Sequence, residues 1–371
     1  MPSLLFSPFR LGGLTLANRI VVAPMAQYSS GPDGLATSWH LMHIGNMAVS
    51  GVSLVMMEAT AVEAKGRISL KCPGLWNDAQ LESLKAVVDF SKQHGGARIG
   101  IQLAHSGRKG SIGAPWEKQR VIPFAEGGWQ PLSCSAREYP GRPVPHMLDK
   151  LELERLKADY VAAAKRADRA GFDVLELHCA HGYLLHSFLS PLINDRGDRY
   201  GGDIEGRMRY PLEVFEAIRE VWPVEKALGV RISATDWIDG GWSLDDSVVF
   251  ASALRPRGGD YISASSGGAT PSQVITVGPS YQVFLAEGIR RRAGMPTVAA
   301  GIINQPAQAE GILQAGSADL IALGRGMTYN PRWAWHAAAE LGEKSVYFPP
   351  QYARSHPSMR LGDFYKVYND P

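Results

Sequence analysis

The stretch DVLELHCAHGYLLHSFLSP, residues 173–191, decides the fold. It opens with a short, continuously apolar run, passes through a polar turn and continues as an apolar segment with helical spacing. A continuous apolar run is typical of a parallel strand that is buried on both faces. His178, His181, Tyr183 and His186 lie at the end of this strand or just after it. Their spacing suits zinc ligands, a helical core face or a catalytic loop, and the stretch alone does not choose among these.

The same pattern of an apolar run followed by a helical segment recurs along the chain. Stretches such as 79–95, 151–171 and 243–258 carry apolar residues at intervals of three and four and end in glycine. The candidate strands are 19–24, 52–58, 98–104, 173–178, 229–234, 260–265, 296–300 and 319–324. Eight such units favour an α/β fold of the (β/α)8 TIM-barrel type. An open doubly wound sheet would need a G-x-G-x-x-G turn after an early strand, and the sequence has none.

Composition points to an ordinary globular protein. The 371 residues are 45% hydrophobic and 20% charged, and the net charge of +2 gives no strong field for nucleic acid or a membrane surface. The run 290–292 is the only basic cluster along the sequence, and we interpret it as a solvated helix end. No transmembrane run or signal peptide is apparent, so we expect a cytoplasmic protein. The three cysteines form no C-x-x-C pair, which argues against an iron–sulfur cluster, structural zinc or disulfides.

A long irregular segment, residues 105–147, follows the third predicted strand. Loops of this length inside a compact domain are usually functional. In a barrel this loop leaves the face on which active sites are built. We therefore expect a lid or pocket wall over the barrel mouth, and the alternative is a solvated insertion.

Polar residues at the predicted strand ends indicate a phosphorylated, flat cofactor. Arg231 lies within a buried strand and needs an anionic partner, either a ligand or an internal carboxylate such as Glu58 or Glu176. Gly301 and the Gly324–Arg325 pair follow strands seven and eight, where barrels commonly bind phosphate. FMN would use all of these groups, together with the amide of Gln102 for its pyrimidine edge and Arg231 for its N1–C2=O region.

Several motifs together resemble the Old Yellow Enzyme family of FMN-dependent ene-reductases. They are LFSPFRLGGLTLANRIVVAPMAQYSS, IQLAHSGRK, ELHCAHGYLLHSFLSPLINDRGDRYGG with RMRYPLEV, and ALGRGMTYNP. The resemblance spans nearly the whole chain. The His178/His181 pair and the short N-terminus are similar to the bacterial xenobiotic-reductase or "thermophilic-like" branch. The family is a flavin (β/α)8 barrel, which implies one FMN-binding domain over residues 1–371.

The resemblance also implies roles for individual residues. His178 and His181 would bind the carbonyl or nitro oxygen of the substrate, Tyr183 would deliver a proton, and Tyr28 would line the pocket. A neighbouring subunit of a homodimer or homotetramer would insert Arg354. The FMN contacts would be Ala23, Pro24, Met25, Ala26, Ala59, Gln102, Arg231, Gly301, Gly324 and Arg325. Ala26 stands where this branch usually has a cysteine, which puts an inherited redox potential and substrate preference in doubt.

The function that follows is an FMN-dependent NAD(P)H:acceptor oxidoreductase of EC 1.6.99 or 1.3.1 type. NADPH or NADH would reduce the flavin, and hydride from flavin N5 would reduce activated C=C bonds in enones, enals, maleimides and nitro compounds. His186 falls one turn into the following helix, so no third zinc ligand is evident and no metal is expected. The alternatives are a non-catalytic flavin-binding or redox-sensing barrel, or another FMN barrel such as a dihydroorotate-dehydrogenase-like or tRNA-dihydrouridine-synthase-like enzyme.

Overall fold

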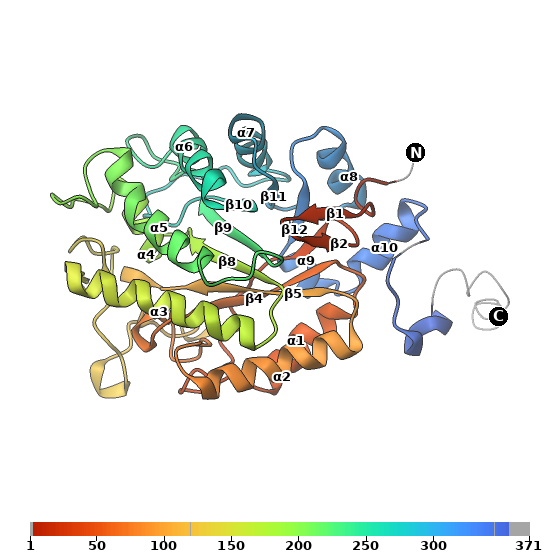
Figure 1. Ribbon diagram of the computed structural model, residues 1–371, viewed down its shortest axis with the longest axis horizontal. Coiled ribbons are helices and arrows are strands. Elements are labelled where there is room, and N and C mark those ends of the chain that lie inside the picture. The colour runs from red at the N-terminus through yellow and green to blue at the C-terminus, as the bar shows by residue number, and fades with distance from the viewer. Residues whose placement is uncertain (1–2, 119, 345, 356–371) are drawn as a thin grey trace.

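A closed barrel of eight parallel strands forms the centre of the protein in a computed structural model (Figure 1). The structure describes residues 3–118, 120–344 and 346–355. The barrel strands, in order, are β3 (Ile20–Val22), β4 (Leu54–Ala61), β5 (Arg98–Ala104), β8 (Val174–Cys179), β9 (Ala227–Ser233), β10 (Tyr261–Ser265), β11 (Thr297–Ala299) and β12 (Leu320–Leu323). β12 pairs with β3 and closes the ring. The predicted TIM barrel is confirmed. One domain over residues 1–371 stays a prediction, because part of that range lies outside the described residues.

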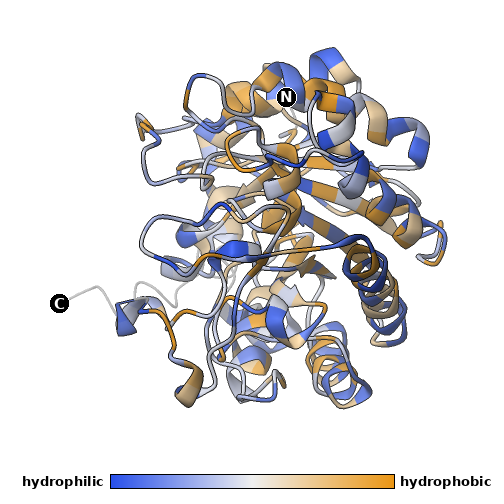
Figure 2. Cartoon of the chain, turned by 90° about the vertical axis from the view of Figure 1, so that its left-hand side faces the viewer, coloured by the Kyte–Doolittle hydropathy of each residue, from blue (hydrophilic) through white to orange (hydrophobic). Residues whose placement is uncertain are grey.

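Helices surround the barrel and follow the predicted helical stretches closely. The larger ones are α1 (Ser38–Ala48), α2 (Asp78–His94), α3 (Lys150–Arg169), α5 (Ile204–Arg219), α6 (Leu244–Leu254), α7 (Val283–Ala293), α8 (Pro306–Gln314) and α10 (Trp333–Glu340). Asn77 and Asp149 begin α2 and α3, because their side chains accept the backbone N–H of the third helical residue. Polar residues mark the outer faces of these helices, and apolar residues dominate the strands (Figure 2). None of the helices in the described part is long and apolar enough to cross a membrane.

A small hairpin, β1 (Phe9–Leu11) and β2 (Leu14–Leu16), closes the end of the barrel opposite the strand tips. Leu11 and Leu16 are fully buried and pack with inward-facing barrel residues such as Leu54, Met56 and Val174. Gly12 makes the tight turn with a φ of +56°, a conformation that favours glycine. The hairpin therefore seals the lower core and leaves the other end free for a ligand.

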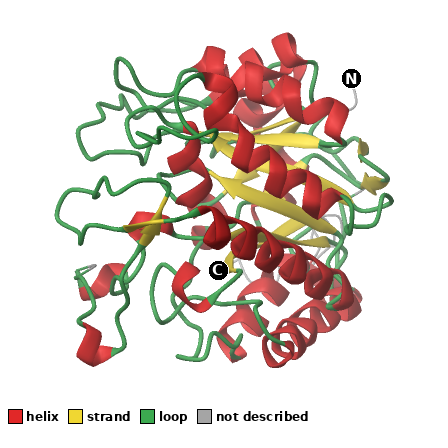
Figure 3. Cartoon of the chain, turned by 60° about the vertical axis from the view of Figure 1, so that its left-hand side comes forward, coloured by secondary structure: helices red, strands yellow, loops and turns green. Residues whose placement is uncertain are grey.

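The long segment 105–147 follows β5 and stands at the end of the barrel where the long loops gather (Figure 3). It contains only short elements, namely η2 (Gly107–Lys109), η3 (Pro115–Glu117), η4 (Phe124–Glu126), β6 (Leu132–Ser133) and β7 (His146–Met147). Buried Arg196 fixes its later part by donating to the carbonyl oxygens of Cys134 at 2.9 Å and Leu148 at 2.8 Å. Trp116 packs edge-on against Tyr28, with ring centroids 5.8 Å apart. The segment is therefore a wall of the barrel mouth, as predicted, and is called the lid below.

Candidate active site

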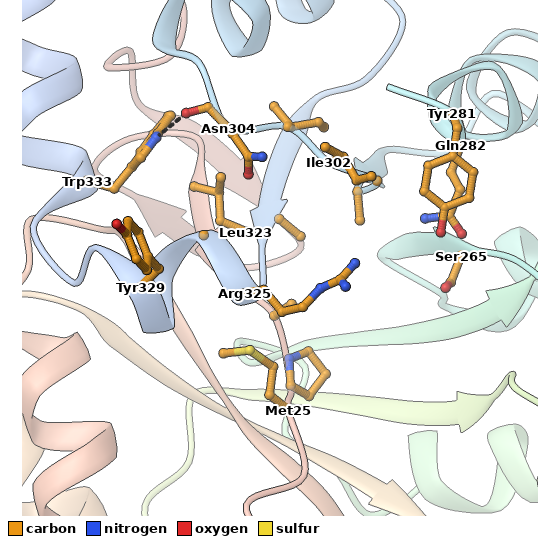
Figure 4. A pocket seen from close by; sticks show the side chains of 18 of the residues that line it. Met25, Ser265, Tyr281, Gln282, Ile302, Asn304, Leu323, Arg325, Tyr329 and Trp333 are labelled. Carbon is orange, nitrogen blue, oxygen red and sulfur yellow. Dashed lines mark hydrogen bonds between the residues drawn. The ribbon is translucent and has the colours of Figure 1, made fainter. Parts of the chain in front are cut away.

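A cavity of about 840 Å³ opens at the ends of β3, β9, β11 and β12. Ala23, Pro24 and Met25 form one side of it directly after β3. Figure 4 places Arg325 and Ile302 on the β12 and β11 side of the same cavity, facing Met25. Ligand pockets commonly have volumes of roughly 300–1,000 Å³. The expected phosphate residues and the expected flavin-contacting segment thus share one cavity of suitable size.

Gly301 shapes the phosphate side of this cavity. Its φ is +119°, in a region that L side chains rarely adopt. A Cβ atom at this position would also lie 3.2 Å from the Gln282 side chain and backbone. The indole of Trp333 on α10 donates to the carbonyl oxygen of Asn304 at 2.7 Å and so anchors the loop after β11 (Figure 4). This leaves an open cradle where backbone can approach a phosphate closely, which fits the predicted role of Gly301, Gly324 and Arg325.

Arg231 on β9 projects into the same cavity and is half-buried. Its Nε is buried and has no hydrogen-bond partner among the described residues. Burial lowers the pKa of Arg231, and the charge of Glu176 opposes that shift. The alternative partner Glu58 instead lies 3.2 Å from His40. An unpaired guanidinium donor in a cavity fits the anionic edge of a bound flavin.

Glu176 on β8 fixes the side chain of Gln102 on β5 through a hydrogen bond. The amide Nε2 donates to Glu176 Oε1 at 2.7 Å, and both side chains are buried. This bond fixes the rotamer of Gln102 and leaves its carbonyl oxygen as an acceptor. Burial raises the pKa of Glu176, while Arg231 opposes the shift. Ala59 stands opposite Gln102 in the β4–β5 register, beside an irregularity in the strand.

His178, His181 and Tyr183 meet at the end of β8. The ring centroid of His178 lies 5.1 Å from that of His181 and 5.1 Å from that of Tyr183, and all three pairs are edge-to-face. His181 has a φ of +60°, a strained conformation for a residue with a side chain, and such strain clusters at functional sites. Burial lowers the pKa of both histidines well below the usual value, and Arg231 lowers it further. Both rings are therefore neutral near pH 7.

The hydrogen bonds of the two histidines define where their protons lie. The backbone N–H of Ala180 donates to His178 Nδ1 at 3.2 Å, so the neutral ring of His178 carries its proton on Nε2. His178 Nε2 then donates to His181 Nδ1 at 3.4 Å, which places the proton of the neutral His181 ring on Nε2 in this structure. His181 Nε2 lies 2.8 Å from the Ser265 hydroxyl, which can either donate or accept. Two ring nitrogens thus converge on one point, and Ser265 can adjust the tautomer of the second.

His186 belongs to a separate, fully buried network that anchors the turn. It lies on α4 (Leu184–Leu189), and its Nδ1 accepts the backbone N–H of Gly182 at 2.7 Å. Its Nε2 lies 3.1 Å from Asp236 Oδ1, while Asp236 Oδ2 accepts from Ser190 at 2.6 Å. Burial alone would raise the pKa of Asp236. The charge of His186 and the hydrogen bonds that Asp236 accepts outweigh this effect, so the pKa of Asp236 is lowered. In the described part of the chain, no three His, Cys, Asp or Glu side chains group as metal ligands would.

Tyr28 and Arg354 lie in different surroundings. Tyr28 packs with Tyr183 against Ile68, Cys72 and Ile112, and burial raises its pKa to about 12. The structure therefore brings Tyr28 and Tyr183 to the same small cluster, and the role of Tyr28 in lining a substrate pocket stays a prediction. Arg354 lies exposed on η6 (Pro350–Ser355), and its insertion into a neighbouring active site stays a prediction.

Ala26 is half-buried, directly before Gln27, whose backbone N–H donates to Glu58 Oε2 at 2.9 Å. This bond fixes the segment after β3. Sequence reasoning missed the parts of the site that support other residues, namely Ser265 as a partner of His181 and Asp236 as a partner of His186. The position of Ser265 at a strand end was the only sign in the sequence that these residues belong to the site. Asp236 follows β9 by three residues, and nothing in the sequence indicates that it lies beside His186.

Comparison with known proteins agrees with the barrel fold and with a flavin cofactor. The NADH:flavin oxidoreductase / NADH oxidase family model matches residues 4–344. The NADPH dehydrogenase of Geobacillus thermodenitrificans (strain NG80-2) is 43% identical over 355 residues, which cover 95% of this chain and 99% of that protein. Morphinone reductase has a similar solved structure, with a TM-score of 0.77, 29% identity and coverage of 95% of this chain and 93% of that one. The solved structure of the Old Yellow Enzyme homologue from Zymomonas mobilis is also similar. Its TM-score is 0.75 at 27% identity, and the match covers 96% of this chain and 99% of that one.

The barrel, its cavity and these relatives define an NAD(P)H oxidoreductase that uses FMN, with NADPH or NADH as reductant. The chain belongs to the NADH:flavin oxidoreductase / NADH oxidase family, and its relatives place it among the Old Yellow Enzymes.

Proposed function

We propose that this enzyme reduces activated C=C bonds in small molecules such as enones, enals and maleimides, and also reduces nitro compounds. One observation carries the proposal: His178 Nε2 and His181 Nδ1 converge at 3.4 Å beside the Tyr183 ring. When bound, FMN supplies a hydride from N5 after reduction by NADPH or NADH. Ala23, Pro24, Met25, Ala26, Ala59, Gln102, Arg231, Gly301, Gly324 and Arg325 would hold it.

The two histidines would bind the carbonyl or nitro oxygen of the acceptor. His178 already carries its proton on Nε2, because its Nδ1 accepts the Ala180 N–H. His181 can carry its proton on Nδ1 when the Ser265 hydroxyl donates to Nε2. Two N–H groups would then point at the oxygen on which negative charge develops. Preorganised donors of this kind are each worth roughly 10²–10³ in rate.

Tyr183 would protonate the carbon next to the activating group. Burial holds the pKa of its hydroxyl well above the ordinary value, so the group stays protonated at neutral pH. It lies on the same turn as the histidines and packs with Tyr28, which would form the opposite wall of the substrate pocket. A positioned proton donor contributes roughly 10²–10⁴ to the rate.

Anaerobic half-reactions test the proposal. We expect the purified protein to show flavin absorbance, to lose it on mixing with NADPH and to regain it when 2-cyclohexenone is added. A protein that bleaches but is not re-oxidised by any enone, maleimide or nitro compound would contradict the proposed acceptor class. Failure to bleach would instead favour a flavin-binding sensor. We further propose a cytoplasmic homodimer or homotetramer, in which Arg354 completes the neighbouring site.

A further inference from the structure

Three cations gather where the lid meets the barrel mouth. Arg108, Lys109 and Arg142 lie around the ring of Tyr139, with their charged centres 5.7, 4.9 and 5.1 Å from its centroid. None of the three forms an ion pair with a carboxylate within residues 3–118, 120–344 and 346–355. The mouth therefore carries an uncompensated positive charge on one wall, which favours an anion there.

Two of these cations, Arg108 and Lys109, already donate hydrogen bonds to backbone carbonyl oxygens. Buried Arg108 donates to the carbonyl oxygens of Glu138 at 2.8 Å and Arg137 at 3.2 Å, and also to that of Ala269. Lys109 Nζ donates to the carbonyl oxygens of His181 at 2.7 Å and Gly268 at 3.0 Å. Burial together with the charges of Arg142 and Arg108 lowers the pKa of Lys109 to about 7. These two groups use most of their donors to build the wall, and their one buried donor without a partner among the described residues is Arg108 Nε.

Arg142 differs because only part of its guanidinium is used. Nη1 donates to the carbonyl oxygen of Lys109, and no bond from Nε or Nη2 is found in the described part of the chain. The side chain is half-buried, and its charge lowers the pKa of Tyr28 and Tyr183 against the larger, opposite effect of burial. The Nζ of Lys109, whose carbonyl oxygen accepts from Arg142, lies 5.3 Å from the centroid of the Tyr183 ring, so Arg142 belongs to the group of lid cations that borders Tyr183.

We propose that Arg142 is a specificity-determining residue that binds a carboxylate on the acceptor, so that the enzyme prefers activated alkenes that also carry a carboxylate. This proposal rests on the proposed function and deepens it. A planar guanidinium with two free donors suits a carboxylate, and partial burial strengthens such a pair.

Matched maleimides test the proposal. We expect wild-type holoenzyme to reduce N-(carboxymethyl)maleimide with a kcat/KM about tenfold or more above that of N-propylmaleimide. Arg142→Gln should remove this preference, with less than about a twofold change for the neutral compound. Arg120→Gln is the control, because Arg120 is also a lid arginine but is exposed and paired with Glu126. It should leave the preference intact. Equal rates for both maleimides in the wild type would overturn the proposal, and so would an equal loss for both in Arg142→Gln.

A binding measurement separates this proposal from the proposed function. The saturated analogues N-(carboxymethyl)succinimide and N-propylsuccinimide cannot be reduced, and their binding to oxidised holoenzyme can be followed by the flavin absorbance. We expect the carboxylate to bind about tenfold more tightly in the wild type, to keep part of this advantage in Arg142→Lys and to lose it in Arg142→Gln. This result would support the carboxylate site even if no alkene were reduced. A selective loss of NADPH over NADH in Arg142→Gln would assign the residue to the coenzyme phosphate and overturn the proposal.

Discussion

The two halves of the barrel mouth are built in different ways. At the ends of β11 and β12 the cavity is open, and Gly301 offers backbone rather than a side chain. At the end of β8 the side chains of buried His178 and half-buried His181 and Tyr183 pack edge to face. The His186–Asp236 network fixes the turn that carries them. The first half is shaped to receive a group, whereas the second is preorganised without one.

The difference follows from what each half must do. A phosphate is already charged, so its site needs only backbone N–H groups that can approach it and a nearby cation. Glycines allow that approach because they carry no side chain. Proton donors must have a defined tautomer and pKa, and only fixed neighbours can provide these. We therefore expect changes in the β8 half to affect the rate of reduction of the acceptor. Changes in the β11–β12 half should affect the retention of FMN.

Tyr183→Phe should give the largest effect and test the β8 half directly. We expect re-oxidation by 2-cyclohexenone to slow by roughly 10²–10⁴, because the proton donor is lost. Reduction by NADPH should change little, since no proton from Tyr183 is needed there. Stopped-flow flavin absorbance measures both half-reactions. Tyr200→Phe is the control, because the Tyr200 hydroxyl bonds Glu213 outside the site. Equal slowing of both half-reactions would mean that the substitution disturbs flavin binding rather than proton transfer.

Gly301→Ala tests the other half. The new Cβ would meet Gln282 at 3.2 Å on a backbone with a φ of +119°, and such strain costs about 1–3 kcal/mol. We expect FMN to bind about 10- to 100-fold more weakly, as measured by the fluorescence of released flavin, while the rate of the fully loaded enzyme stays similar. Gly311→Ala on α8 is the matched control, because nothing lies within 4 Å of its Cβ. Unchanged FMN affinity would show that this half tolerates side chains.

The pH dependence of stability sharpens the comparison, because the β8 half carries two histidines whose pKa values are lowered. The pKa values of His178 and His181 are lowered on folding. The unfolded chain therefore binds more protons below about pH 6.5. Their contribution to stability is complete above that pH and is lost as the pH falls, by about 1.4 kcal/mol per pH unit for each histidine. Urea unfolding at pH 7.5, 6.5 and 5.5 should show a shallower decline in His178→Gln than in the wild type. The exposed His94→Gln should keep the wild-type slope, and a parallel decline in all three proteins would contradict the assignment.

The sequence predicted the barrel well and the support of its site poorly. The barrel strands are continuous apolar runs, so their positions could be read without the structure. The hairpin β1–β2 was missed because three-residue strands carry no usable periodicity. The basic run 290–292 was visible in the sequence, but each arginine pairs with a carboxylate: Arg290 with Asp319, Arg291 with Glu287 and Arg292 with Asp245. The unpaired cations at the lid come from positions more than 30 residues apart, at 108–109 and 142, and only the fold brings them together.

Ser265→Ala is the smallest change that still separates the two halves. It removes the only hydrogen-bond partner of His181 Nε2 found in the described part of the chain. Without the hydroxyl, the tautomer with the proton on Nδ1 is less favoured, and a neutral hydrogen bond is worth about 1 kcal/mol. We expect kcat/KM for 2-cyclohexenone to fall about fivefold, with FMN affinity and reduction by NADPH unchanged. The exposed Ser272→Ala should behave as the wild type. If Ser265→Ala keeps full activity on enones, the proton of His181 is placed by another group, and the β8 half is less preorganised than its contacts indicate.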